Sequence, residues 1–339
     1  MTTGKTCVLG GGSWGATIAS HLAKKGQKVY LWEFSEDQVR RMKETRKLSF
    51  LPQLHIPESV LITSVMAEAL EGSDAVFSTV PSQFVRSTWF AAKKYAAGAG
   101  LIVSLSKGIE TETLKRMTEV IIEEFPGAKD IIAAVSGPSH AEEVATEIPT
   151  AVVVASRHKI IAETALQMLG TKFFRVYTNP DVVGVELGGA LKNIFAIACG
   201  VCDGIKMGDN TKAALVTRGL HEMSRLGMRM GGKQSTFSGL SGMGDLVVTC
   251  FSQYSRNRLL GEKIGQGKNA TEALKEMTMV AEGYPTSRSA HGLAQKYGCE
   301  CPIINEIYQV LYDGKNARKS VQNLMDRPMR TETEEAGWE

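Results

Sequence analysis

The sequence predicts an α/β domain with a doubly wound, mainly parallel sheet, followed by an all-α domain. In the first half, short apolar strand patterns alternate with helical patterns, an order typical of parallel sheets covered by helices. Several of these strands are continuous apolar runs, as expected of strands buried on both faces. After Asn179-Pro180 the strand patterns fade and helical patterns take over.

The first half begins with a strand at residues 6–9 and a helix at residues 13–25, which Gly26 ends. The further strands are predicted at residues 28–32, 75–80, 101–105, 131–135, 151–155 and 173–177. Each is short and apolar and is separated from the next by enough chain for a crossover helix, so the strands should pair in parallel.

The second half is predicted to be all-helical. Its helices are expected at residues 181–202, 211–230, 256–265, 271–279, 286–297 and 303–312. A chain of 339 residues suits two domains. We therefore expect domains at residues 1–180 and 181–330, and a frayed acidic tail at residues 331–339.

Composition limits the classes of function. The net charge is +3 and no run of Lys or Arg forms a basic tail, which disfavours nucleic acid as the main partner. The N-terminus lacks a signal-peptide pattern, and no later segment offers about 18 uncharged apolar residues. We expect a cytoplasmic protein without stable membrane insertion.

The six cysteines include a C-x-x-C pair, Cys199 and Cys202, and a C-x-C pair, Cys299 and Cys301. A zinc site built from both pairs is one interpretation. The apolar helical run around Cys199 favours the other, buried reduced thiols. The six histidines show no metal spacing, and we predict no metal.

A glycine-rich turn follows the first strand. Gly10, Gly12 and Gly15 form G-x-G-x-x-G between the strand at residues 6–9 and the helix that opens at Ser13. The glycines permit a tight turn, close approach of a pyrophosphate and close helix packing, and the helix N-terminus faces the phosphates. This is the fingerprint of a Rossmann domain; the alternative is a turn that packs the helix without binding anything.

Glu33 ends the second strand, where the fingerprint expects an acidic residue that binds a ribose hydroxyl. Its charge would repel the 2′-phosphate of NADP, so we infer NAD as the cofactor, with NADP as the alternative. A solvated Glu at a strand end is the other interpretation. Arg40 and Arg41 are near in sequence and would favour NADP if a loop turned them inward.

Lys107 lies in a loop, Ser104-Leu105-Ser106-Lys107-Gly108, that follows another strand of the sheet. Ligands bind outside the carboxyl ends of such strands, so Lys107 is well placed to meet an anion. Val80-Pro81-Ser82-Gln83 follows a strand in the same way. A solvated surface lysine is the alternative interpretation.

Seven motifs in order resemble the NAD(P)-dependent glycerol-3-phosphate dehydrogenase family over residues 5–325. They are Gly10-Gly11-Gly12-Ser13-Trp14-Gly15, Ser106-Lys107-Gly108, Ser136-Gly137-Pro138-Ser139, Glu186-Leu187-Gly188-Gly189-Ala190-Leu191-Lys192-Asn193, Thr217-Arg218-Gly219-Leu220, Gly242-Met243-Gly244-Asp245-Leu246 and Ser255-Arg256-Asn257. The resemblance implies reversible reduction of dihydroxyacetone phosphate to glycerol 3-phosphate for phospholipid synthesis. It also implies a homodimer, with the active site between a Rossmann domain and a helical domain.

The resemblance assigns roles to individual residues. Lys192 is implied to be the catalytic acid/base. Implied at the substrate are Lys107, Gly137, Ser139, Asn193, Asp245, Thr249, Arg256 and Asn257, and we expect Ser255 there as well. Implied at the cofactor are Ser13, Trp14, Ala141, Arg256 and Glu282, and we also expect Gly10, Gly12, Gly15, Glu33, Phe34, Lys107 and Val280 there. Bacterial-type members often carry neutral or basic residues where Trp32-Glu33-Phe34 stands, so Glu33 departs from the pattern of many NADP-using relatives.

The residues themselves suit this chemistry. Lys192 lies in an apolar helix, and burial should lower its pKa toward neutrality, as an acid/base requires; a lysine that reaches water from a buried helix is the alternative. Ser255 reads as a helix N-cap, and Arg256 at that helix N-terminus suits a phosphate. A capped surface helix with a solvated Arg is the alternative there.

The sequence leaves the roles of Glu186, Asn193 and Asp245 open. Glu186 and Asn193 are seven residues apart on one helix face and could line one cavity. Asp245 ends a glycine-rich stretch from Ser238, predicted to be a loop that approaches a ligand. Its carboxylate could accept a bond from a substrate hydroxyl, orient Lys192 or cap the next helix. His140 is assigned no role, because its surroundings read as a turn.

Two other functions remain under consideration. One is a two-domain dehydrogenase of a hydroxy acid or sugar acid, which the motifs after residue 136 disfavour. The other is a non-catalytic NAD(H) sensor, although no separate interaction domain is evident.

Overall fold

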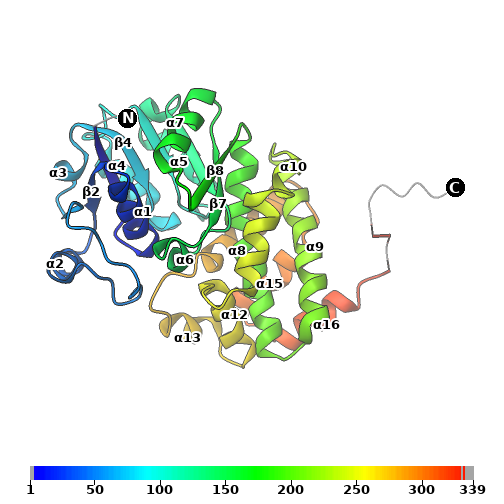
Figure 1. The fold of residues 1–339 in the computed structure, drawn as a ribbon. Helices are drawn as coiled ribbons and strands as arrows, with labels where there is room; N and C mark the ends of the chain where they lie inside the picture. The colour runs from blue at the N-terminus through cyan, green and yellow to red at the C-terminus, as the bar shows by residue number, and fades with distance from the viewer. Residues whose placement is uncertain (1–3, 330, 333–339) are drawn as a thin grey trace.

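The computed structural model describes residues 4–329 and 331–332. The chain forms an α/β part, blue to green in Figure 1, and a helical part, green to red. The eight strands are β1 (Lys5–Leu9), β2 (Lys28–Trp32), β3 (Leu61–Thr63), β4 (Ser73–Ser78), β5 (Leu101–Ser104), β6 (Ile132–Ser136), β7 (Thr150–Ala155) and β8 (Phe174–Asn179). They form one sheet in the order β3-β2-β1-β4-β5-β6-β7-β8. Its first six strands have the order of a dinucleotide-binding sheet, which confirms the predicted fold class.

Helices cover both faces of the sheet. On one face lie α1 (Ser13–Lys24), α2 (Glu36–Thr45), α6 (Ala141–Ala145) and α7 (Lys159–Leu169), whose apolar residues join one core. On the other lie α3 (Met66–Leu70), α4 (Val85–Ala92) and α5 (Met117–Glu124) in a second core. The continuous apolar strands therefore lie between two helical layers, as their patterns predict.

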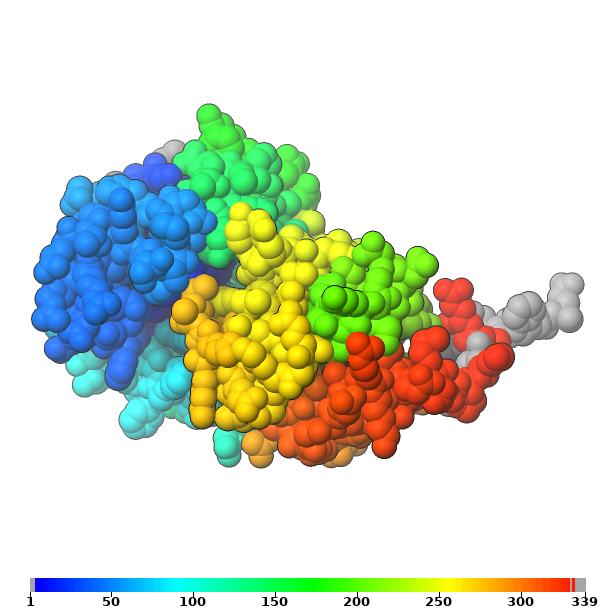
Figure 2. All heavy atoms as spheres, turned by 90° about the horizontal axis from the view of Figure 1, so that it is seen from below, coloured from blue at the N-terminus to red at the C-terminus, as the bar shows by residue number. Residues whose placement is uncertain are grey.

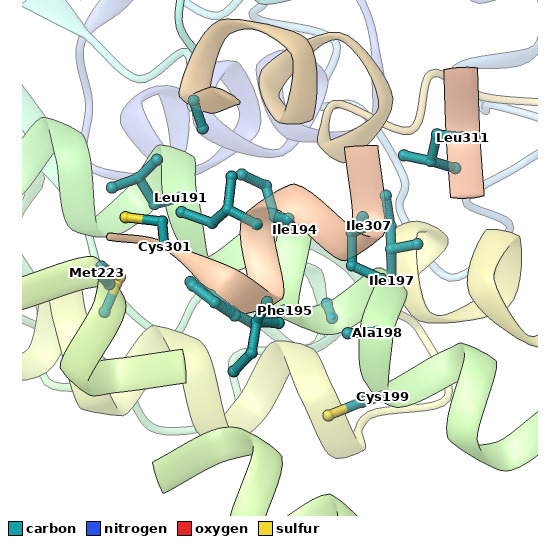
Figure 3. Packing of buried hydrophobic residues seen from close by; sticks show 14 of the residues in the cluster. Leu191, Ile194, Phe195, Ile197, Ala198, Cys199, Met223, Cys301, Ile307 and Leu311 are labelled. Carbon is teal, nitrogen blue, oxygen red and sulfur yellow. The ribbon is translucent and has the colours of Figure 1, made fainter. Parts of the chain in front are cut away.

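The helical part is built around α8 (Val182–Gly204). Around it lie α9 (Gly208–Arg229), α10 (Gln234–Phe237), α11 (Asp245–Phe251), α12 (Arg256–Gly265), α13 (Ala270–Lys275), α14 (Gly283–Lys296), α15 (Pro302–Tyr312) and α16 (Ala317–Met325). Figure 3 shows α8 side chains such as Leu191 and Phe195 packed with Met223 and Ile307. α8 also contacts β6 and β7, so the central helix forms part of the junction with the sheet.

The structure corrects several details of the prediction. β6 and β7 pair antiparallel, whereas all other neighbours are parallel. β3 was not predicted, because three residues give too short a pattern. The helix predicted at residues 271–279 ends at Lys275; beyond it, the Val280 carbonyl accepts a hydrogen bond from Arg256 instead of continuing a helical ladder.

The predicted boundary near residue 180 falls between the end of β8 and the start of α8. As a division into two folding domains it stays a prediction. Of the predicted acidic tail, all but residues 331–332 lies outside the described residues.

α8 is long and apolar enough to span a membrane by length and composition, but 83% of that window is buried inside the protein. The core helix of a soluble protein passes the same test, so this feature is weak evidence for a membrane.

Candidate active site

A cavity of about 730 Å³ lies where the α/β part meets the helical part. It is lined by residues that follow β1, β2, β4 and β5 and by residues of α8, α11 and α12. Figure 2 shows the molecular surface hollowed between the blue N-terminal segments and the yellow segments of the helical part. The cavity therefore lies at the carboxyl ends of the strands, where such sheets bind ligands.

The glycine-rich turn forms one end of the cavity. Gly10 has a φ of +105°, which favours glycine. A Cβ on Gly15 would lie 1.8 Å from the Gly10 carbonyl oxygen, so only glycine permits this close packing. Nothing lies within 4 Å of the position that a Cβ on Gly12 would take. The α1 N-terminus at Ser13 thus faces open space that fits a pyrophosphate.

Glu33 lines the same end of the cavity. Its carboxylate accepts hydrogen bonds from the backbone N–H of Gly11 (2.8 Å) and of Ser35 (3.0 Å). These bonds fix the charge beside the glycine turn. Arg40 and Arg41 are exposed on α2 and do not line the cavity, so the inward turn that would favour NADP does not occur.

Asp245 joins two lysines at the other end. Its Oδ1 lies 2.9 Å from Nζ of Lys192, and its Oδ2 lies 2.7 Å from Nζ of Lys107. Lys192 also donates to Thr249 Oγ1 at 2.6 Å, and Lys107 donates to the Gly137 carbonyl at 2.9 Å. Lys192 and Asp245 are only 6% and 2% exposed, so the ammonium of Lys192 does not reach bulk water.

Burial lowers the pKa of Lys192 to about 8; the charge of Asp245 opposes this shift, and the charge of Lys107 adds to it. For Asp245, burial alone would raise the pKa, but the two lysines outweigh burial and hold it below its ordinary value. The site thus holds an ionised carboxylate beside an amine that can be charged or neutral near physiological pH.

Two asparagines connect this cluster to the helical part. Asn257 accepts from the Gly283 N–H (2.8 Å) and donates to Asn193 Oδ1 (2.9 Å). Asn193 in turn donates to the Lys107 carbonyl at 3.4 Å. These bonds fix the orientation of both amides at the cavity wall.

The third side of the cavity contains α12 and the segment that follows α13. Ser255 accepts from the Arg258 N–H at 3.2 Å, which confirms the predicted N-cap. Arg256 donates to the Val280 carbonyl at 3.0 Å. Glu282 accepts from the Ser82 N–H at 2.8 Å and from its hydroxyl, so this carboxylate ties the helical part to the loop after β4.

Comparison with known proteins decides the family. The model of the NAD-dependent glycerol-3-phosphate dehydrogenase N-terminus matches residues 5–162, and the C-terminus model matches residues 181–322. The glycerol-3-phosphate dehydrogenase [NAD(P)+] of Citrifermentans bemidjiense is 49% identical over 97% of this chain and 98% of its own length. The chain belongs to the NAD(P)+-dependent glycerol-3-phosphate dehydrogenase family.

Solved structures agree with this assignment. Glycerol-3-phosphate dehydrogenase from Coxiella burnetii superposes with a TM-score of 0.89 at 37% identity, covering 96% of this chain and 99% of that one. A D-mandelate dehydrogenase shares the fold alone, with a TM-score of 0.64 at 12% identity. The protein is therefore an NAD(P)-dependent oxidoreductase, and neither the hydroxy-acid nor the sensor alternative is supported.

Almost all residues expected at the site of this dehydrogenase line the cavity between its α/β part and its helical part. These are Gly10, Gly12, Ser13, Trp14, Gly15, Glu33, Phe34, Lys107, Ser139, Ala141, Lys192, Asn193, Asp245, Thr249, Ser255, Arg256, Asn257, Val280 and Glu282. Gly137 does not line it; its carbonyl holds Lys107 instead. The roles of these residues toward substrate and cofactor stay predictions.

Two expectations about the dehydrogenase were wrong. Glu186 does not share the cavity with Asn193, because Arg116 and Thr118 bind its carboxylate. The stretch before Asp245 is not a loop that approaches a ligand, since residues 240–244 form a π-helical turn. A Cβ on Gly242 would lie 1.9 Å from the Phe237 carbonyl oxygen, so this glycine allows close backbone packing.

Asp245 does not cap α11. It is the first residue of that helix, the cap position belongs to Gly244, and no side chain bonds there. The carboxylate is engaged by Lys107 and Lys192 instead. The capping role is therefore wrong, and the contact of Asp245 with Lys192 fits the role of orienting that lysine. A bond from Asp245 to a substrate hydroxyl stays a prediction.

Sequence reasoning missed several residues of the cavity. His140 lines it, and burial lowers the pKa of its imidazole to about 4 with a further contribution from the charge of Lys192. Tyr254 lines it and contacts the His140 ring edge-on. Ser136 does not line the cavity, but it donates a hydrogen bond to Asp245 Oδ2 at 3.3 Å. The Ser139-His140 pair beside a strand end was the available signal for His140.

The six cysteines are free and buried, with the Sγ atoms of Cys299 and Cys301 3.7 Å apart. Within the described part of the chain, no three His, Cys, Asp or Glu side chains converge to hold a metal ion.

Proposed function

We propose that this dehydrogenase interconverts dihydroxyacetone phosphate and sn-glycerol 3-phosphate with Lys192 as the acid/base. The observation that carries this proposal is the buried Lys192, whose lowered pKa lies near working pH beside an ionised Asp245. The nicotinamide, when bound, supplies or accepts the hydride at C2 of the substrate. Proton transfer and substrate binding are proposed to be carried out by side chains of the protein.

In the direction of reduction, the ammonium of Lys192 polarises the ketone and donates a proton to the C2 oxygen. In the direction of oxidation, the neutral amine accepts the proton of the C2 hydroxyl. Asp245 holds Lys192 in place through the 2.9 Å contact. Thr249 Oγ1 accepts a second hydrogen bond from the amine at 2.6 Å and so orients it further. A base with a pKa near the operating pH serves both directions.

The phosphate of the substrate is proposed to bind at the N-terminus of α12. Arg256 uses one N–H for the Val280 carbonyl, which leaves other donors of its guanidinium for an anion. The first residues of α12 add backbone N–H groups and the positive end of the helix dipole. Lys107 also lines this cavity and adds a second positive charge.

The cofactor is proposed to be NAD, with its pyrophosphate at the N-terminus of α1 and its adenosine ribose at Glu33. The open space at Gly12 and the fixed carboxylate of Glu33 both fit this placement. A 2′-phosphate would bring a second negative charge to Glu33, and we therefore expect NADPH to bind less tightly than NADH.

We further propose that the enzyme acts as a homodimer in the cytoplasm, without stable membrane insertion, and supplies glycerol 3-phosphate for phospholipid synthesis. Similarity to the family supports each of these statements. Light scattering of the purified protein should give twice the mass of the chain, whereas the mass of one chain would contradict the dimer.

The function is tested by the initial rate of NADH and NADPH oxidation with dihydroxyacetone phosphate. Rapid oxidation that is faster with NADH supports the activity and the role of Glu33. A preference for NADPH would support the activity but show that Glu33 does not bind the ribose. Folded protein that binds NADH but oxidises it only with a hydroxy-acid precursor such as a 2-keto acid would contradict the proposal.

A further inference from the structure

Glu186 binds across the junction between the two parts of the protein. It belongs to α8 of the helical part, yet its carboxylate bonds to the start of α5 in the α/β part. The carboxylate accepts from the Thr118 N–H at 2.8 Å and from the Thr118 hydroxyl at 2.6 Å. It also accepts from the guanidinium of Arg116.

This contact is buried and specific. The side chains of Glu186 and Arg116 are only 6% and 8% exposed. Thr118 is the second residue of α5, and its N–H therefore has no partner within its own helix. Within α5 the Glu119 carboxylate accepts from the Arg116 N–H, and Glu186 adds from the helical part an acceptor for the Thr118 N–H.

Glu186 shares one face of α8 with Gly189 and Asn193, and this whole face meets the α/β part. A Cβ on Gly189 would lie 2.3 Å from Ser136 Oγ and 3.6 Å from Lys107 Cγ. Asn193 donates to the Lys107 carbonyl at 3.4 Å. The three residues form a seam, which we define as Glu186, Gly189 and Asn193, along which α8 lies against the sheet part.

The seam bears on the catalytic cluster because the cluster is assembled from both sides of it. Lys107 comes from the α/β part, whereas Lys192 and Asp245 come from the helical part. Any rotation or slide of α8 along the seam would change the distance from Lys107 to Asp245, now 2.7 Å. Glu186 accepts hydrogen bonds from Arg116 and Thr118 at the end of the seam away from the cavity.

We propose that Glu186 is a positioning residue: by capping α5 and pairing with Arg116, it sets α8 so that Lys107 and Lys192 meet at Asp245. Glu186 touches neither substrate nor cofactor in this proposal and acts only through α8. The inference rests on the proposed role of Lys192 as the acid/base.

The test compares Glu186→Gln with Glu119→Gln. Both substitutions remove a carboxylate that pairs with Arg116, but Glu119 binds it within the α/β part, with Arg116 Nη2 2.8 Å from Glu119 Oε1. For Glu186→Gln we expect kcat to fall by about tenfold or more, because small displacements of reacting groups are costly. The KM for NADH should stay within about twofold, since the cofactor turn is not disturbed. Glu119→Gln should keep the kcat of the unsubstituted enzyme.

The pH profile supplies a readout that loss of stability alone would not move. The charged or titratable groups that act on Lys192 are Asp245, Lys107, His140 and Cys250. If the seam loosens and Lys107 moves away, the positive charge of Lys107 no longer lowers the pKa of Lys192. Asp245 then raises that pKa with less opposition. The pH range over which the rate of glycerol 3-phosphate oxidation rises should then move to higher pH in Glu186→Gln and stay in place in Glu119→Gln.

Folded Glu186→Gln enzyme with the kcat and pH profile of the unsubstituted enzyme would overturn the proposal, even if its melting temperature fell. If Glu186→Gln does not fold, the test uses Thr118→Val, which removes the hydroxyl that donates to Glu186 and accepts from Arg116 but leaves the Glu186 carboxylate in place. A lowered kcat with a shifted profile in Thr118→Val supports the proposal, and an unchanged profile overturns it. Absence of activity in the unsubstituted enzyme would instead contradict the proposed function.

Discussion

The carboxylate of Asp245 lies 2.9 Å from Nζ of Lys192, and both side chains are withdrawn from solvent. Bringing a charged pair out of water is unfavourable unless each charge is well bonded. Here the second oxygen of Asp245 bonds to Lys107, so one carboxylate serves two amines. Burial lowers the pKa of Lys192, the charge of Asp245 opposes this shift, and the charge of Lys107 adds to it. A lowered pKa is the property that an acid/base needs.

Lys192→Ala should lower kcat by about 10²–10⁴-fold, the usual contribution of a positioned acid/base. Binding of NADH should stay within about twofold, because the glycine turn lies at the other end of the cavity. Steady-state kinetics and NADH fluorescence titration measure the two effects. Lys159→Ala on the exposed face of α7 is the control. An unchanged kcat in Lys192→Ala would remove this lysine from the mechanism.

Arg256→Ala should raise the KM for dihydroxyacetone phosphate by about 10–100-fold, with a smaller change in kcat. A phosphate anchor binds ground state and transition state alike, and a charged hydrogen bond contributes about 1.5–3 kcal/mol. Dihydroxyacetone without phosphate is the matched substrate, and it should react equally poorly with both enzymes. A fall in kcat alone would show that Arg256 positions something other than the phosphate.

Glu33→Gln should reduce the preference for NADH over NADPH by about tenfold or more, because like charges at one site are strongly unfavourable. The ratio of kcat/KM for the two cofactors measures this change. The control is Glu36→Gln, an exposed acidic residue in the first turn of α2. If the ratio stays the same, the charge of Glu33 acts only on the Gly11 and Ser35 backbone.

Glu222 should make stability depend on pH. Its buried carboxylate accepts from the backbone N–H of Ile303 and Ile304, and burial raises its pKa to about 7. The folded state then binds the proton more tightly than the unfolded chain, so stability falls as pH rises from about 4.5 to about 7, by on the order of 3 kcal/mol. Urea unfolding across this range should show a smaller fall for Glu222→Gln. An equal fall in both proteins would contradict this assignment.

Much of the fold could be predicted from sequence because its signals are local. The apolar strands and the glycine turn at Gly10 are contiguous patterns, and they lie where expected. The antiparallel pairing of β6 with β7 could not be predicted, since strand direction depends on how the chain crosses between them. The three residues of β3 likewise carry too little pattern to distinguish a strand from a loop.

The site was predictable only in part. Lys192 stood out as a charge in an apolar helix, and Ser255 as a cap before Arg256. The bonds of Glu186 were not predictable, because Thr118 lies 68 residues away in sequence. For His140 the only local signal was its place after Ser139 at a strand end, whereas its interaction with Lys192 depends on the packing of β6 against α8.

The most direct test of the account is the pH dependence of kcat in both directions for the unsubstituted enzyme, Asp245→Asn and Lys107→Met. Oxidation of glycerol 3-phosphate needs neutral Lys192, so its rate should rise with pH through about 8, and reduction should fall over the same range. Asp245 raises the pKa of Lys192 and Lys107 lowers it. The transition should therefore move to lower pH in Asp245→Asn and to higher pH in Lys107→Met. If neither substitution moves it, a group other than Lys192 carries the proton, and the central claim is wrong.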